Sequence, residues 1–270
     1  MKWAVEVGNV GDGTPEGAAR YCLKLGLEGV SLPWARVPGF EEKGYLEAEA
    51  IAPIRKKIED MGVEFAPMVA WAPRDLPKGE EAGKHFANLR RSFEAMAAVG
   101  VDTLIMFPPG RPDSPWDEIV AYYRELIKIA EEFNIRIALH NHGQFKPVKV
   151  LKRLMEDVPS PLNGVCLCSG NSWHGDGEAM YDTMRELAGK IFFVHVRNVK
   201  TGEGEKEYWL EQGDVDLPRF IKVLKEMGYD GYVRSEHLPT DMYRTHEPEV
   251  AGVSDIGTAY SVGYLRAYMK

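Results

Sequence analysis

Four apolar, strand-like segments in the second half of the chain each end in a side chain that can bind a metal ion. They are IALHNH (137–142), VCLCSG (165–170), FFVHVRN (192–198) and YVRSEH (232–237). Residues two apart on a strand point to the same side, so the His, Cys and Glu residues lie on one face and the apolar residues between them on the other. In a parallel barrel the C-terminal strand ends meet at one face of the fold. The pattern therefore predicts parallel strands whose ends converge.

The whole chain alternates eight times between a strand-like segment and a segment with the 3.6-residue period of a helix. The clearest helix has Asp216 as its predicted N-cap, Pro218 in its first turn and Gly228 at its end. No Ser/Gly-rich linker or charge block divides the sequence. We therefore predict an α/β fold, a single (β/α)8 TIM barrel formed by residues 1–270 as one domain. The expected strands are 2–7, 28–33, 64–70, 103–108, 135–141, 164–169, 191–197 and 231–236.

Length and composition agree with one large enzyme domain. The chain has 270 residues, 44% of them hydrophobic, and barrels of this kind have about 250 residues. A net charge of −8 argues against a nucleic-acid partner, which needs a basic surface, and no apolar run approaches the ~18 residues of a membrane span. Three cysteines without an opening signal segment favour the cytoplasm. We expect a cytoplasmic protein with a small-molecule partner, and a homo-oligomer remains open.

His140, Cys168, His195 and Glu236 are the predicted ligands of one divalent metal ion. His140 or Cys168 alone would more often be a core residue. An inward-facing carboxylate such as Glu236, however, seldom stays buried at a strand end without a partner. Two imidazoles, a thiolate and a carboxylate are compatible with Zn²⁺, Fe²⁺ or Mn²⁺, and the thiolate disfavours Mg²⁺ and Ca²⁺.

Several residues beside these ligands are candidates for proton transfer or substrate binding. His142 and His237 adjoin the ligands, and imidazole titrates near neutral pH. Arg197 shares the face of His195, where it would bind a substrate carboxylate, and the neighbouring Asn198 is included with it. Arg111 follows the fourth strand, where it would either reach a substrate anion or belong to a rigid turn.

Two loops near the strand ends have simpler interpretations. KTGEGEKE (200–207) is expected to be a solvated turn. NSWHGDG (171–177) directly follows Cys168 and is expected to be a mobile lid or a plain loop.

Five segments of the chain resemble the mannonate dehydratases of the xylose-isomerase-like barrel superfamily: NGVCLCSGNSW, IFFVHVRNV, EQGDVDLPRF, GYDGYVRSEHLP and the closing GYLRAYM. The resemblance extends over 164–270 and is architectural before that. In that family His, Cys, His and Asp hold Mn²⁺ or Fe²⁺. The resemblance therefore implies Mn²⁺ as the first choice of metal on the four predicted ligands, with Glu236 in place of the family Asp. It also implies acid/base roles for His237 and for Tyr260 in the last βα unit.

The chain also departs from that family. The isomerase and epimerase branch of the superfamily uses Glu, Asp, His and Glu at the same strand ends, so Cys168 is dehydratase-like and Glu236 isomerase-like. The resemblance implies a metal-dependent sugar-acid dehydratase that converts D-mannonate or a related aldonate to a 2-keto-3-deoxy acid. The alternative is a metal-dependent isomerase or epimerase acting on a neutral sugar. A catalytically silent binding barrel is disfavoured by His142 and His237.

Overall fold

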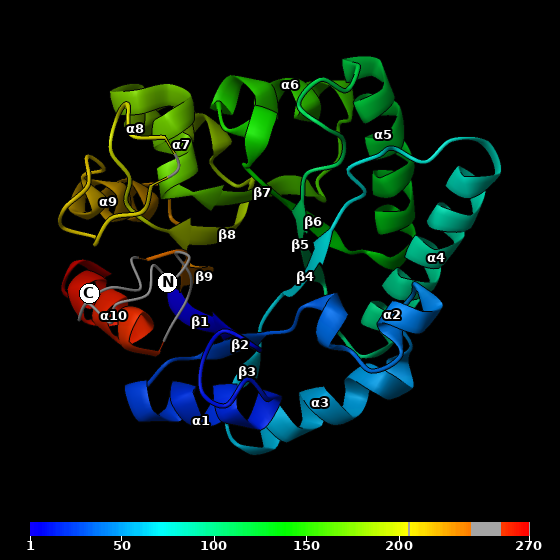
Figure 1. The fold of residues 1–270 in the computed structure, drawn as a ribbon, viewed down its shortest axis with the longest axis horizontal. Helices are drawn as coiled ribbons and strands as arrows, with labels where there is room; N and C mark the ends of the chain where they lie inside the picture. Colours follow the sequence, from blue (N-terminus) through cyan, green and yellow to red (C-terminus); the bar gives the residue numbers. More distant parts are fainter. Residues whose placement is uncertain (205, 239–254, 270) are drawn as a thin grey trace.

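Parallel strands form a ring in the middle of the molecule, and helices surround it (Figure 1). In this computed structural model the described residues are 1–204, 206–238 and 255–269. The sheet order is β3-β2-β1-β9-β8-β7-β6-β5-β4, and the neighbours pair in parallel. The strands are β1 (Lys2–Glu6), β2 (Gly29–Ser31), β3 (Glu64–Phe65), β4 (Met68–Trp71), β5 (Thr103–Phe107), β6 (Arg136–His140), β7 (Asn163–Cys168), β8 (Ile191–Val196) and β9 (Tyr232–Ser235).

Strands β3 and β4 are two parts of the strand that the sequence predicts over 64–70. Pro67 has no backbone N–H and interrupts the ladder between them. Strand β3 pairs with β2, and β4 pairs with β5. The backbone N–H of Val69 donates to Leu32 O at 3.1 Å, which closes the ring across the break. The nine strands therefore form an eight-unit barrel, and the predicted fold class is confirmed.

Each unit continues into a helical segment on the outside of the ring (Figure 1). The predicted cap is confirmed in α9, where the Asp216 side chain accepts from Arg219 N at 3.0 Å. No helix in the described ranges is both long and apolar enough to cross a membrane. The α-helices are α1 (Pro15–Leu25), α2 (Phe40–Lys43), α3 (Ala48–Asp60), α4 (Gly79–Ala98), α5 (Trp116–Phe133), α6 (Val148–Asp157), α7 (Ser169–Asp176), α8 (Met180–Thr183), α9 (Leu217–Glu226) and α10 (Asp255–Met269).

The prediction of a lid or loop over 171–177 is wrong, because most of this segment belongs to helix α7. Small polar residues on α7 are buried against the barrel, so the helix lacks the apolar period that would reveal it in the sequence. Ser169 binds both backbone groups of Arg197, the residue directly after β8, donating to its O at 2.7 Å and accepting from its N at 3.0 Å. Tertiary contacts of this kind stabilise the helix.

The strand alternation divides the core into two layers. Leu139, Leu167 and Val194 point outward and belong to the large apolar cluster that also contains the buried side chains of the surrounding helices. A smaller cluster fills the barrel interior and consists of Ala4, Ala66, Val69, Ile105, Ala138, Cys166 and Phe193. Three of these precede a predicted ligand by two residues, so this cluster forms the floor beneath the polar strand ends.

Candidate metal centre

The four predicted ligands converge at the C-terminal ends of β6 to β9. His140, Cys168 and His195 have no exposed surface, and Glu236 is 6% exposed. Glu236 lies between the other three. Its Oε1 is 3.4 Å from His140 Nε2 and 3.5 Å from His195 Nδ1, and its Oε2 accepts from Cys168 Sγ at 2.8 Å.

Strand register explains this convergence. Cys168 on β7 is the register partner of His195 on β8, and His195 is the partner of Arg234 on β9. The backbone N–H of Glu236 donates to Val196 O at 2.9 Å, which holds the carboxylate at the level of the histidines. Inward-facing residues of adjacent strands thus meet because the strands are parallel and in register.

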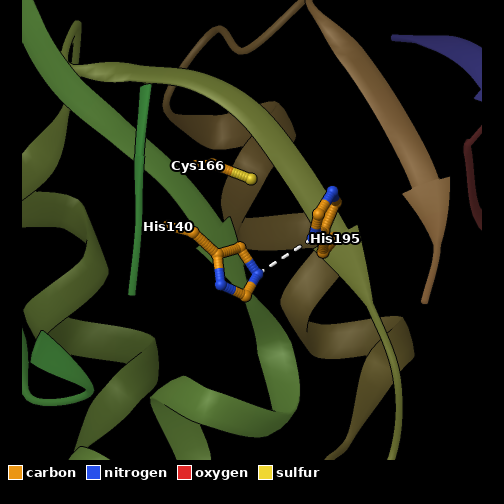
Figure 2. Close-up of side chains that lie close together, drawn as sticks. All are labelled: His140, Cys166 and His195. Atoms are coloured by element: carbon orange, nitrogen blue, oxygen red, sulfur yellow. Dashed lines mark hydrogen bonds between the residues drawn. The ribbon is translucent and has the colours of Figure 1, made fainter. Parts of the chain in front are cut away.

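The spacing of the donor atoms fits a single ion. The facing nitrogens, His140 Nε2 and His195 Nδ1, are 2.9 Å apart (Figure 2). With Glu236 Oε1 they form a triangle with the other two edges at 3.4 and 3.5 Å. An ion with bonds of about 2.1 Å holds its donors about 3.0 Å apart at right angles and about 3.4 Å apart at tetrahedral angles. Three donors therefore already stand at ligand spacing.

The buried carboxylates and guanidinium groups around the cluster leave one net negative charge that a cation would balance. Glu6, Glu207 and Glu236 carry three negative charges, and Arg197 and Arg234 carry two positive ones, on side chains that are at most 9% exposed. A divalent ion together with a deprotonated cysteine would bring the sum to zero. Buried charge without compensation is costly. Donor type, spacing and charge all agree with a divalent metal site.

Protonation states in the cluster also suit metal binding. Burial, reinforced by the charge of Glu236, raises the pKa of the Cys168 thiol, so the thiol keeps its proton and donates it to the carboxylate. An incoming cation would displace that proton, as thiolate binding requires. Burial, followed by the positive charge of Arg234, lowers the pKa of His195 to about 3. The imidazole of His195 is therefore neutral and retains a lone pair for a ligand bond.

Two cavities lie over the strand ends. The inner cavity has a volume of about 270 Å³, and its wall includes Glu6, Arg234 and Glu236. The outer cavity, of about 500 Å³, includes His142 and Arg111. Trp71, Phe107 and His237 line both, and the rings of Trp71 and Phe107 stack with centroids 4.7 Å apart. A small molecule in this space would contact Glu236 of the centre directly.

The structure brings two of the three predicted proton-transfer residues to these cavities. His237 is exposed and lines both, and His142 is exposed in the wall of the outer one, with its ring centroid 6.0 Å from that of His140. Tyr260 lies elsewhere. Its hydroxyl donates to Glu211, its ring packs on Trp209, and it lines neither cavity.

The arginine and asparagine predicted to bind substrate are engaged by the protein itself. Arg197 Nη1 pairs with Glu207, its Nη2 donates to Asn171 Oδ1 at 2.6 Å, and its Nε is 3.4 Å from Glu236 Oε2. Asn198 donates from Nδ2 to Leu210 O and Val215 O and accepts at Oδ1 from two backbone N–H groups. Arg197 therefore positions the Glu236 carboxylate, and Asn198 holds the loop that follows β8.

Arg111 is exposed in the wall of the outer cavity. It forms a bidentate ion pair with Asp75, in which Nε donates to Oδ1 at 2.6 Å and Nη2 donates to Oδ2 at 2.8 Å. The expectation of a solvated turn over 200–207 is wrong at its last residue, because the Glu207 side chain is 5% exposed and pairs with Arg197. Sequence reasoning had no signal for this contact, since Glu207 lies in a polar, glycine-containing stretch. Arg234 was also missed, although its spacing of two residues from Glu236 placed it on the inner face.

Replacement of Glu207 by Ala should lower the free energy of unfolding by about 3 kcal/mol, because it leaves the buried Arg197 charge short of a partner. Asn171 and Glu236 still contact Arg197, so the loss should lie at the low end for broken buried pairs. Glu203→Ala is the matched control, because this exposed residue of the same loop pairs with Lys206 at the surface. Urea unfolding of both variants measures the difference. Equal midpoints would contradict a structural role for Glu207.

Comparison with known proteins agrees with this architecture. The chain is 28% identical over 184 residues to mannonate dehydratase 1 of Halalkalibacterium halodurans, an alignment that covers 63% of this chain and 45% of that protein. The chain thus spans about half the length of the curated relatives it matches. It is therefore related to mannonate dehydratases at low identity.

Solved structures share the whole fold. A mannonate dehydratase from Streptococcus suis serotype 2 superposes with a TM-score of 0.76 at 19% identity, covering 100% of this chain and 94% of that one. The D-psicose 3-epimerase of Clostridium cellulolyticum H10, solved with D-tagatose, gives a TM-score of 0.74 at 12% identity and covers 100% of both chains. The sequence also matches the xylose isomerase-like TIM barrel family over residues 19–252. The chain belongs to the xylose isomerase-like TIM barrel family.

Proposed function

We propose that this chain is a metal-dependent sugar-acid dehydratase that converts D-mannonate or a related aldonate to a 2-keto-3-deoxy acid. The observation that carries the proposal is the buried cluster of His140, Cys168, His195 and Glu236, next to a cavity lined by Arg234 and His237. The relationship to mannonate dehydratases supports the same class of reaction.

The four clustered residues would hold the metal, with Mn²⁺ as the first choice and Fe²⁺ or Zn²⁺ as alternatives. A divalent ion supplies Lewis acidity toward the substrate carboxylate and 2-hydroxyl, which acidifies the C2 proton. In the dehydration, the C2–H bond breaks and a base takes the proton. The C3–O bond breaks as an acid protonates the leaving hydroxyl to water, and the enol product then tautomerises to the 2-keto acid. His237 and His142 line the cavities and are the side chains we assign to these proton transfers.

Arg234 is the side chain we assign to the substrate carboxylate. It is 6% exposed, its Nη1 pairs with Glu6, and its Nε has no hydrogen-bond partner among the described residues. The oxygens of Glu6 are engaged by Arg234 and by Asn9 Nδ2 at 3.0 Å, so Glu6 orients the guanidinium without covering all of it. The terminal nitrogens of Arg197 and the guanidinium of Arg111 already bind protein groups outside the inner cavity, whereas Arg234 lines the inner cavity and its buried Nε has no partner among the described residues. A buried donor without a partner favours a ligand that accepts its hydrogen bond.

Arg234→Lys should lower kcat/KM for an aldonate by about 10–100-fold, because lysine keeps the charge beside Glu6 but loses the fork that binds a carboxylate. Arg111→Lys is the control and should change kcat/KM by less than about threefold, since Arg111 is exposed and bound to Asp75. Steady-state kinetics of both variants measures this. A larger loss in Arg111→Lys than in Arg234→Lys would move the carboxylate site to the outer cavity.

A sugar isomerase or epimerase with the same metal centre is the second candidate. It is favoured by the glutamate at position 236 and by the full-length fold similarity to a D-psicose 3-epimerase. A neutral sugar would offer Arg234 hydroxyl groups but no carboxylate.

Incubation of the full chain and Mn²⁺ with a panel of aldonates and aldoses or ketoses tests both functions. We expect a 2-keto-3-deoxy acid from D-mannonate or a related aldonate. Ketose formation or epimerisation without any keto acid would support the second candidate. The absence of turnover with every member of the panel would contradict both.

A further inference from the structure

Cys166 gives the paired histidines a second thiol neighbour. It is the register partner of His140, and its Sγ and one nitrogen each of His140 and His195 lie within 4.8 Å of one another. Figure 2 shows this group, with the Cys166 side chain beside the two imidazoles. All three side chains have no exposed surface. One nitrogen of each ring, His140 Nδ1 and His195 Nε2, also has no hydrogen-bond partner among the described residues.

The two thiols approach the histidines from different levels of the barrel. Cys168 lies at the strand end and contacts Glu236. Cys166 lies two residues earlier on β7 and packs into the floor with Ala138 and Phe193. The cluster therefore contains two overlapping donor groups. The outer set is the four-residue centre of His140, Cys168, His195 and Glu236, and the inner set is His140, Cys166 and His195, so the two sets share both histidines.

We propose that the inner set, His140, Cys166 and His195, is a second metal-binding position that takes thiophilic divalent ions such as Cd²⁺ or Zn²⁺. The inner set offers two imidazole nitrogens and a thiolate without any oxygen, whereas the outer set contains a carboxylate. Soft thiolate donors select thiophilic ions, and carboxylate oxygen suits Mn²⁺. Because both sets use His140, an ion in the inner set excludes one in the outer set.

The inner set needs little rearrangement to close on an ion. A tetrahedral ion holds a nitrogen and a sulfur donor about 3.6 Å apart, and these donors already lie within 4.8 Å. Closure therefore asks for displacements of about 1 Å. As the sulfur–metal bond forms, the Cys166 proton leaves to solvent, so binding involves no change of oxidation state.

A metal ion bound by His140, Cys166 and His195 would also be inaccessible to substrate. Glu236 and His237 line the inner cavity, but Cys166 lines neither that cavity nor the outer one. Thiophilic ions bound there would occupy the centre without contacting a molecule in the cavity. The inference concerns metal selection, so it does not depend on the identity of the substrate.

Metal titrations of the full chain and of two matched variants, Cys166→Ser and Cys168→Ser, test the proposal. Cd²⁺ is followed by sulfur-to-cadmium charge-transfer absorbance, and Mn²⁺ by the electron paramagnetic resonance of the free ion. We expect Cys166→Ser to weaken Cd²⁺ binding by about 10–100-fold and to leave the Mn²⁺ affinity unchanged. Cys168→Ser should do the reverse. In the unmodified chain Cd²⁺ should displace Mn²⁺ with a stoichiometry of one.

Cys166→Ala serves as a second variant in case a buried serine disturbs the floor, and its unchanged Mn²⁺ affinity would report an intact centre. Equal Cd²⁺ affinity in the unmodified chain and in both Cys166 variants would overturn the proposal. Simultaneous binding of Cd²⁺ and Mn²⁺ would also overturn it, because the two sets share His140. If Cys168→Ser kept full Mn²⁺ affinity, the outer ligand set behind the proposed dehydratase would fail, while the inner position would stand on its own Cd²⁺ result.

Discussion

Replacement of His237 by Asn should lower kcat for the aldonate by about 10²–10⁴-fold, the usual contribution of a general acid or base. His237 follows Glu236 in the chain, is exposed, and lines both cavities. Because its ring is not packed in the core, the substitution should leave the melting temperature and the bound Mn²⁺ unchanged. Near-normal turnover would exclude His237 and direct attention to His142 and Tyr260.

Solvent exchange distinguishes the two roles open to His237. In D₂O, deuterium that enters C2 of recovered substrate while dehydration stops would identify His237 as the acid for the leaving hydroxyl. Loss of both exchange and dehydration would identify it as the C2 base. Tyr260→Phe is the comparison variant and should retain kcat within about threefold, because the Tyr260 hydroxyl binds Glu211 outside the cavities. A loss as large as that of His237→Asn would restore Tyr260 as a proton-transfer residue.

Glu236→Gln should reduce Mn²⁺ affinity by more than about 100-fold, more than the loss of a residue that only supports a ligand. The carboxylate is in contact with His140, His195 and Cys168. The substitution therefore replaces one carboxylate oxygen by an amide nitrogen and takes away the negative charge that the cation balances. Cys168→Ala should also weaken binding strongly, since a thiolate contributes both charge and a bond. Elemental analysis of purified variants measures the retained metal.

Glu6→Gln is the matched control for Glu236→Gln. Glu6 is also a buried glutamate in the wall of the inner cavity, but it binds Arg234 and Asn9 instead of the clustered histidines. It should therefore retain its Mn²⁺. Undiminished metal in Glu236→Gln or in Cys168→Ala would remove the substituted residue from the ligand set.

Local periodicity in the sequence was sufficient to predict the barrel and the four residues that converge at its strand ends. Strand alternation places His140, Cys168, His195 and Glu236 on inward faces, and eight strand–helix alternations predict a parallel ring that brings strand ends together. The same rule explains why Leu139 and its counterparts meet the helices. One break escaped the prediction, because Pro67 lies inside a run that otherwise reads as a single strand.

The ion-pair partners of the charged side chains could not be predicted from the sequence and are visible only in the folded structure. The sequence places Arg197 and Arg234 on inward faces alike, yet Arg197 is held by Glu207 and Asn171, whereas Arg234 pairs with Glu6 and lines the inner cavity. Glu207 comes from a loop whose path no local pattern predicts. Helix α7 is held by buried hydrogen bonds between Ser169 and the backbone of Arg197, directly after β8, and hydrophobic periodicity in the sequence cannot reveal such contacts.

The sequence by itself thus determined which residues face the barrel interior, because side-chain direction in a strand depends only on position along that strand. Tertiary structure decided which inward residues touch one another and which partners the two inward arginines take. Those outcomes depend on strand register and loop path, which arise from contacts between segments far apart in the chain.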